Sequence, residues 1–251
     1  MLLEDKTAVI YGAGGSIGGA VTRAFAREGA RVFLAGRTLA KLDAVAEEIR
    51  AAGGTAETAE VDALNPAAVD RHADAVAREA GSLDISFNLI THPGVHGTPL
   101  HEMELDDFMS SVLTALSSSF LTSRAAARHM IRQRGGVILT FGGSGDPMRD
   151  YYIGGTQVAF EALEVLRRQL ATELGRHGIR TVTLRTGGVP ESLPEGFEGR
   201  EAIVEGMEKE ALLPRTATLE DVGNVAAFVA SDKARTMTAA TANVSCGALL
   251  D

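Results

Sequence analysis

A glycine-rich turn between a predicted strand and a predicted helix constrains this sequence most. The segment TAVIYGAGGSIG, residues 7–18, begins with an apolar run, continues with a cluster of glycines and enters a helical pattern at Ile17. Glycines allow a tight turn and a close approach of the backbone to phosphate, and the N-terminus of a helix favours an anion. An ordinary glycine-rich loop is the alternative. Because a second predicted strand follows the helix, we favour a dinucleotide-binding site.

Composition excludes several classes of function. The 251 residues carry a net charge of −9 without a basic run, which argues against binding to nucleic acid. The start, MLLEDKTAVI, has no signal-peptide pattern, and no apolar run is long enough to span a membrane. The single cysteine, Cys246, rules out an internal disulfide. We therefore expect a soluble cytoplasmic protein. No cluster of His, Cys and carboxylate residues has metal-ligand spacing, so we expect no metal.

Predicted strands and helices alternate along the whole chain. The strands are expected at residues 8–10, 31–35, 55–61, 83–90, 137–141, 179–184 and 241–245. The helices are expected at residues 17–28, 39–52, from Asn65 onward, and at 105–134, 151–177 and 219–230. Strands separated by helices of this length predict a parallel sheet with helices on both faces. We predict a single α/β domain of Rossmann type, with a doubly wound parallel sheet of about seven strands.

The segment 186–214 interrupts this alternation. It contains Pro190, Pro194 and several glycines before an acidic, helix-like stretch. Such segments are often mobile and frequently cover a substrate. We expect a substrate lid here.

The predicted helix at 151–177 carries two apolar stripes. The first contains Ala159, Leu163, Leu166, Leu170 and Leu174, and the second contains Val158, Ala162 and Val165. One stripe can cover the sheet, and a partner subunit could bury the other. A helix packed between its neighbours is the alternative. The pattern favours a homotetramer or homodimer.

Several ordered segments resemble the short-chain dehydrogenase/reductase family over nearly the whole chain. The opening turn is similar to TGxxxGxG, with Ser16 at the middle glycine, and LDISFN is similar to LDILVN, which places Asn88 at the first Asn of NNAG. Further family-like segments are FLTSRAAARHM, ELGRHGIRTVTLRTGG, LEDVGNVAAFVAS and ANVSCGA. The resemblance implies a Rossmann fold that binds NAD(P)(H) and acts on a small molecule.

The second strand ends in Ala-Gly-Arg-Thr, residues 35–38, without a carboxylate for a ribose 2′-hydroxyl. Arg37 suits a 2′-phosphate, so NADP(H) is favoured over NAD(H), with a solvated arginine as the alternative. The Ser16 hydroxyl is a candidate helix cap or phosphate contact. Together with the resemblance, these features place cofactor contacts at Gly12, Gly14, Ser16, Ile17, Gly18, Arg37, Asp62, Asn88, Gln157, Gly187 and Val189.

The resemblance breaks down at the catalytic positions. Alignment puts Ile153 at the family's tyrosine, Gln157 at its lysine and Ala115 at its asparagine. The serine position falls on residues 142–143, both glycine, and Ser144 comes one residue late. Glutamine can hydrogen-bond a ribose but carries no charge to lower the pKa of a tyrosine.

Four residues remain as candidates for proton transfer. They are Tyr152, Tyr151, His92 and Ser144, the last through a bound water, with Gln157 beside them. Helix-start packing of the tyrosines and ordinary turn chemistry around His92 are the alternatives. We favour an NADP(H)-dependent oxidoreductase that reduces a carbonyl, imine or activated alkene. A non-redox cyclase, isomerase or dehydratase, or an inactive nucleotide-binding protein, remains open.

Overall fold

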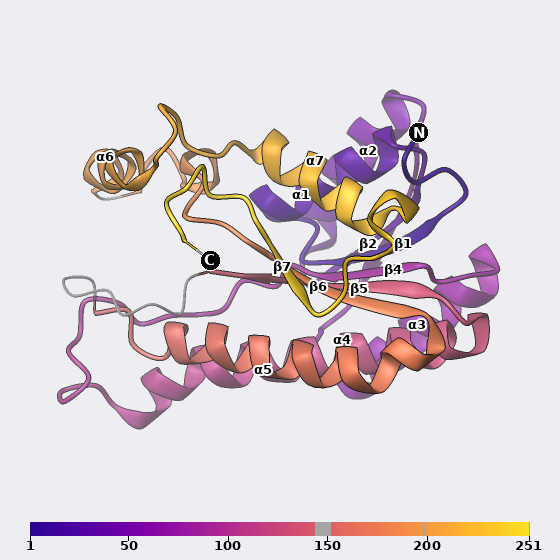
Figure 1. Ribbon diagram of the computed structural model, residues 1–251, viewed down its shortest axis with the longest axis horizontal. Coiled ribbons are helices and arrows are strands. Elements are labelled where there is room, and N and C mark those ends of the chain that lie inside the picture. Colours follow the sequence, from indigo (N-terminus) through magenta and orange to yellow (C-terminus); the bar gives the residue numbers. More distant parts are fainter. Residues whose placement is uncertain (144–151, 198, 251) are drawn as a thin grey trace.

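The computed structural model describes residues 1–143, 152–197 and 199–250 and contains a seven-stranded parallel sheet (Figure 1). The strands are β1 (Thr7–Tyr11), β2 (Arg31–Gly36), β3 (Thr55–Glu60), β4 (Ile85–Asn88), β5 (Gly136–Gly142), β6 (Ile179–Arg185) and β7 (Ala240–Asn243). Their order in the sheet is β3-β2-β1-β4-β5-β6-β7. The order reverses between β1 and β4, and ligands of such sheets bind at the carboxyl ends of the strands near this point. The predicted doubly wound α/β fold is confirmed.

Helices cover both faces of the sheet (Figure 1). On one face lie α1 (Ser16–Arg27), α2 (Leu39–Ala51) and α7 (Leu219–Ala230), and on the other lie α3 (Pro66–Ala80), α4 (Leu105–Gln133) and α5 (Thr156–Leu174). Each layer encloses its own buried apolar cluster, so the sheet is covered on both sides as its parallel strands require. A further helix, α6 (Arg200–Glu210), buries none of its residues.

Helix α5 begins later than the sequence pattern predicts. It starts at Thr156, whereas the predicted helix covered residues 151–177, and Tyr151 lies outside the described residues. Gly154 adopts a left-handed φ of 57°, and a Cβ on Gly155 would lie 2.0 Å from the carbonyl oxygen of Phe108. These two glycines hold a tight turn against α4, so the helix cannot extend back to Tyr152.

Strand β4 is shorter than the predicted 83–90, and side chains bind the backbone N–H groups of residues 83 and 90. The backbone N–H of Leu83 donates to the Gln133 side chain at 3.0 Å, and that of Ile90 donates to Asn88 Oδ1 at 2.9 Å. The last strand likewise spans Ala240–Asn243 instead of 241–245.

The helix N-termini differ in how they are capped. Asn65 caps α3 by accepting from Ala68 N at 3.1 Å, and Thr218 with Asp221 forms a capping box on α7. The Arg215 guanidinium and the Thr218 backbone hold the pKa of Asp221 at about 2. By contrast, α1 and α2 begin at Gly15 and Thr38 with no side-chain cap and no acidic residue in their first turns. Their exposed N–H groups therefore remain available to an external anion.

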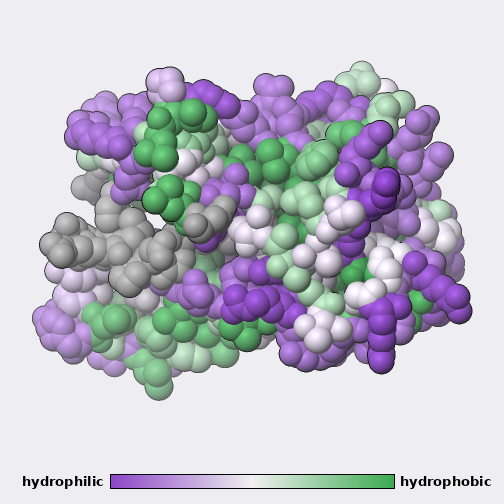
Figure 2. Space-filling model, viewed as in Figure 1, coloured by the Kyte–Doolittle hydropathy of each residue, from purple (hydrophilic) through white to green (hydrophobic). Residues whose placement is uncertain are grey.

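Exposed apolar side chains lie on the α4 and α5 layer. They include Leu113, Phe120, Val158 and Val165, each between 47% and 57% exposed. Figure 2 shows apolar surface at the lower left, over this layer. The second predicted stripe of α5 therefore leaves at least Val158 and Val165 uncovered within one chain.

The described residues lack two further features. In that part of the chain no helix is long and apolar enough to cross a membrane. Nor do any three His, Cys, Asp or Glu side chains gather there in a way that could hold a metal ion.

A histidine is buried between α3 and the end of β1. The His72 ring meets Tyr11 edge-on with centroids 5.9 Å apart, and His72 Nδ1 has no hydrogen-bond partner among the described residues. Burial lowers the pKa of His72 to about 4. Burial, followed by the nearby Asp70 carboxylate, raises the pKa of Tyr11. His72 is therefore neutral in the folded protein at neutral pH.

This burial predicts a loss of stability in mild acid. The unfolded chain protonates His72 near pH 6.5, whereas the folded chain does so near pH 4, so the unfolded state binds more protons between these values. Stability should fall as the pH drops through this window, by up to about 3 kcal/mol from His72 alone. Denaturant unfolding of wild type and His72→Leu at pH 7 and pH 4.5 measures the effect. An equal pH-dependent loss in both proteins would contradict it.

Candidate functional site

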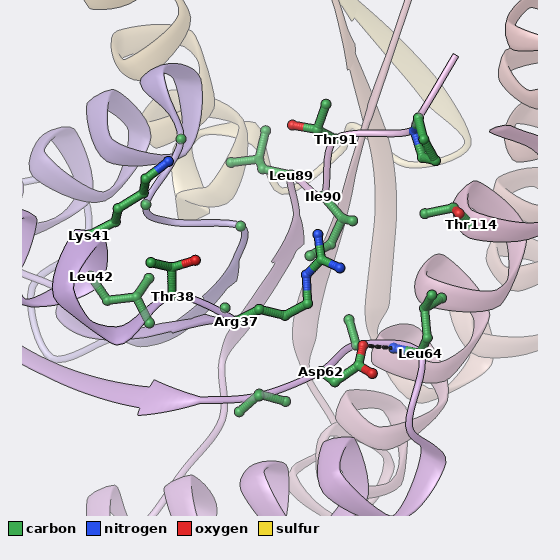
Figure 3. Close-up of a pocket in the computed structure, with 17 residues that line it drawn as sticks. Arg37, Thr38, Lys41, Leu42, Asp62, Leu64, Leu89, Ile90, Thr91 and Thr114 are labelled. Atoms are coloured by element: carbon green, nitrogen blue, oxygen red, sulfur yellow. Dashed lines mark hydrogen bonds between the residues drawn. The ribbon is translucent and has the colours of Figure 1, made fainter. Parts of the chain in front are cut away.

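A cavity of about 500 Å³ opens at the carboxyl ends of β1 to β4 (Figure 3). Gly12 follows β1, Gly36 ends β2, Asp62 follows β3 and Leu89 follows β4, and all four line this cavity. It lies at the point where the strand order reverses. The fold therefore places an open cleft where doubly wound sheets bind their ligands.

The glycine turn forms one wall and is held by close backbone contacts. Gly12 has φ 83°, and a Cβ there would lie 2.4 Å from the carbonyl oxygen of Leu89. A Cβ on Gly18 would lie 2.1 Å from the carbonyl oxygen of Gly12. Side chains at these positions would push the turn away from β4 and from α1. Gly14 and Gly15 line the cavity with their backbones, as predicted for a phosphate-binding turn.

Two other predicted contacts of this turn, Ser16 and Ile17, stay predictions as cofactor contacts. Gly15 is the N-cap residue and Ser16 the first helical residue, so the expectation that Ser16 caps α1 is wrong. Ile17 packs against the buried cluster beneath α1. Neither residue is among those that line the cavity.

Two cations face the cavity without a partner. Arg37, which was predicted, and Lys41, which was not, both line it, and neither side chain forms an ion pair or hydrogen bond with any described residue. The Thr38 hydroxyl between them does not cap α2. The sequence spacing could have predicted Lys41, because it lies one helical turn after Arg37 and on the same side of the start of α2.

Asp62 and Asn88 have different positions relative to the cavity. Asp62 lines it, and its Oδ1 accepts from Leu64 N at 3.0 Å (Figure 3). Asn88 is buried, and its amide donates to hydroxyls of α4, including those of Ser118 at 3.2 Å and Thr122 at 3.3 Å. Asn88 therefore fixes the end of β4 and lies outside the cavity lining.

The predicted contacts after β6 pack into the protein. Val189 is only 2% exposed and belongs to the buried cluster beneath α1 and α7. Gly187 lies so close to Ala248 that a Cβ would be 2.7 Å from the alanine Cβ. The Met207 side chain of α6 covers Gly188, with its methyl 2.7 Å from the place of a Cβ. None of these residues lines the described cavity.

An aromatic ring occupies the space where the resemblance expects a serine side chain. A Cβ on Gly143 would lie 2.6 Å from Phe160 Cε2 of α5. The His92 ring is tilted against Phe160 with centroids 6.1 Å apart, and burial lowers the pKa of His92. Phe160 and His92 therefore form an apolar contact at the end of β5.

The segment that carries His92 is tied to both long helices. Ser111 Oγ of α4 donates to the carbonyl oxygen of Pro93 at 2.7 Å, and His96 Nε2 lies 3.4 Å from Thr156 Oγ1 of α5. The backbone N–H of Gly97 donates to the carbonyl oxygen of Tyr152 at 3.0 Å. These contacts place His92 beside the start of α5.

The remaining catalytic candidates are only partly placed. Tyr152 is 49% exposed, has a left-handed φ of 43° and precedes α5, so it lies outside the helix that was predicted to include it. Gln157 lies in the first turn of α5, and its Nε2 is buried without a hydrogen-bond partner among the described residues. Ser144 and Tyr151 lie outside the described residues.

Known proteins match this chain over nearly its full length. Residues 12–248 match the family described as enoyl-(acyl carrier protein) reductase. An L-rhamnose 1-dehydrogenase (NAD(P)(+)) of Azotobacter vinelandii is 31% identical over 98% of each chain. A meso-2,3-butanediol dehydrogenase of Serratia marcescens is 30% identical over 99% of this chain and 96% of its own. An A-factor type gamma-butyrolactone 1'-reductase of Streptomyces virginiae is 29% identical over 98% of this chain and 96% of its own.

Solved structures agree with these relatives. A short-chain type dehydrogenase/reductase from Mycobacterium ulcerans superposes with a TM-score of 0.90 at 25% identity, over 99% of this chain and 91% of that one. A second structure, from Mycobacterium marinum, superposes with a TM-score of 0.87 at 27% identity, over 99% of this chain and 97% of that one. The strand order, the cleft at the switch point and these relatives lead to one conclusion: the chain belongs to the short-chain dehydrogenase/reductase family, whose members bind NAD(P) and include many oxidoreductases.

Proposed function

We propose that this protein is an NADP(H)-dependent oxidoreductase that reduces a carbonyl, imine or activated alkene of a small molecule. The observation that carries the proposal is a pair of cations, Arg37 and Lys41, that have no partner among the described residues, in a cavity with no carboxylate at the end of β2. A carboxylate there would favour the 2′-hydroxyl of NAD(H), whereas a guanidinium favours the 2′-phosphate of NADP(H).

The described residues fit a dinucleotide at both ends. The uncapped start of α1 at Gly15 suits a pyrophosphate, and Asp62 lines the adenine side. At the other end, the buried and unpartnered Nε2 of Gln157 suits a ribose hydroxyl. In the proposed contact set Gly12 and Gly18 shape the turn, Asn88 holds the end of β4, and Gly187 and Val189 flank the nicotinamide. When bound, the dinucleotide supplies the hydride.

Proton transfer in this proposal is atypical. Gln157 brings no ammonium to lower the pKa of a tyrosine, so Tyr152 or Tyr151 would act as an acid in reduction more readily than as a base in oxidation. Burial lowers the pKa of His92, which makes its protonated form a stronger acid. A water near Ser144 is the fourth candidate.

A non-redox reaction is the second candidate. Phe160 covers Gly143 at the end of β5, and neither of these two side chains carries a hydroxyl that could orient a carbonyl. A cyclase, isomerase or dehydratase would use the same cleft for positioning alone. Turnover without net consumption of NADPH would identify this case, and binding without any turnover would identify an inactive nucleotide-binding protein.

Segment 186–214 completes the proposed active site as a lid. It contains α6, whose Met207 packs on Gly188, while no residue of α6 is buried. Few buried contacts allow such a segment to move as substrate enters.

The first prediction concerns cofactor choice. Wild type should bind NADPH more tightly than NADH, and Arg37→Ala should lose about tenfold or more in NADPH affinity, because a hydrogen bond between charged groups is removed. Fluorescence titration of both cofactors measures this. Arg71→Ala, an exposed arginine on α3, controls for the change in net charge. Equal wild-type affinities, or an unchanged preference in Arg37→Ala, would contradict the NADP(H) assignment.

The second prediction concerns chemistry. Reduction of simple ketones should be slow, because loss of a positioned general acid removes roughly a hundredfold to ten-thousandfold in rate. Installing the family residues with Ile153→Tyr, Gln157→Lys and Gly143→Ser should raise this rate only if Phe160→Leu also clears the space at residue 143. NADPH oxidation with a panel of ketones, imines and activated alkenes provides the measurement.

Two results would count against this placement of the active site. One is fast ketone reduction by the wild type that Tyr152→Phe does not slow. The other is a triple variant that gains as much activity with Phe160 as with Leu at that position.

The third prediction is a homotetramer, or at least a homodimer, joined through α4 and α5. The exposed Phe120 and Val165 would then be buried between subunits, and Phe120→Asp with Val165→Asp should lower the assembled mass. Phe228→Asp, on the opposite layer, is the matched control. Light scattering at micromolar concentration reports the mass. A monomeric wild type would refute the prediction.

A further inference from the structure

We propose that Lys41 binds the pyrophosphate of the dinucleotide, while Arg37 binds the 2′-phosphate, so that the two cations serve different phosphates. This inference rests on the proposed cofactor and adds a contact that the glycine turn alone does not supply.

The position of Lys41 against the glycine turn is the first observation. A Cβ on Gly14 would lie 2.9 Å from Lys41 Cβ, so the stem of Lys41 packs directly on the turn that precedes α1. Gly14 therefore has no room for a side chain, and the lysine stem occupies that place. The lysine stem therefore starts beside the backbone of the glycine turn, which is where a pyrophosphate would bind.

The separation of the two cations is the second observation. In Figure 3 the Lys41 side chain lies at one side of the cavity and its nitrogen points away from Thr38, whereas the Arg37 guanidinium points toward the middle of the view. The two groups do not converge on one point. The proposal therefore assigns one phosphate to each cation.

The electrostatics of α2 is the third observation. Lys41 lies in the first turn of α2, where the helix dipole disfavours a cation, and this turn has no acidic residue to compensate. Within the described residues Lys41 has no carboxylate partner either. Lys41 is exposed to solvent, and an anion in the cavity would give its ammonium group a partner of opposite charge.

Two fragments of the cofactor allow the pyrophosphate contact and the 2′-phosphate contact to be measured separately. ADP carries the pyrophosphate without a 2′-phosphate, and adenosine 2′-monophosphate carries the 2′-phosphate without a pyrophosphate. Calorimetric titration of each fragment into the protein, without divalent cations, measures binding independently of activity. Lys41→Met keeps the aliphatic stem against Gly14 and removes the charge.

Lys41→Met should weaken ADP binding by about tenfold or more and change adenosine 2′-monophosphate binding by no more than about twofold. It should weaken NADPH and NADH by the same factor. Arg37→Ala should show the opposite pattern with the two fragments. Lys41→Arg should restore most of the ADP affinity, and Lys233→Met, an exposed lysine outside the cavity, should change neither fragment.

Each other outcome overturns a specific part of the account. If Lys41→Met weakens only adenosine 2′-monophosphate, Lys41 belongs to the 2′-phosphate and the inference is wrong. If it weakens neither fragment, Lys41 does not bind a phosphate. If Lys41→Met behaves as expected but the wild type does not prefer NADPH, the assignment of Arg37 fails while that of Lys41 stands. If the wild type binds no ADP, both proposals fail.

Discussion

The close packing of Gly12 and Gly18 is the contact on which the rest of the site depends. Because Gly18 has no side chain, α1 starts directly against the carbonyl group of Gly12, and because Gly12 adopts a positive φ, the turn lies against the end of β4. The N-terminus of α1 therefore opens into the cleft between β1 and β4. A methyl group at either position would collide with backbone atoms, which cannot move aside as a flexible side chain can.

The nucleotide cleft and the proposed catalytic region offer a ligand different kinds of surface. The cleft offers uncapped helix starts and two cations without a partner in the described part of the chain, which an anionic ligand would satisfy. In the proposed catalytic region Phe160 covers Gly143 and packs near His92, so an apolar contact lies where the family resemblance expects a hydroxyl. Such a surface positions a planar group well but polarises a carbonyl poorly. Substrates with their own electronic activation are therefore the ones we expect it to reduce.

The fold was predictable because strand and helix patterns alternate and because ordered motifs recur along the chain. Arg37 was also accessible from sequence, since its position follows from the end of β2. The spacing of Lys41, one helical turn after Arg37, was a signal in the sequence, but its contact with Gly14 forms only when α2 packs against the glycine turn. The contact between Phe160 and Gly143, which are far apart in sequence, is invisible for the same reason. The helix start at Thr156 was misplaced because the close approach of Gly155 to Phe108, not local propensity, decides it.

The most direct test of the account is a crystal structure of the protein with bound NADP⁺. The account predicts the adenosine 2′-phosphate beside Arg37, the pyrophosphate between Lys41 and the start of α1 at Gly15, and a ribose hydroxyl within hydrogen-bond distance of Gln157 Nε2. A nucleotide bound away from the glycine turn, or a 2′-phosphate that contacts neither cation, would contradict it.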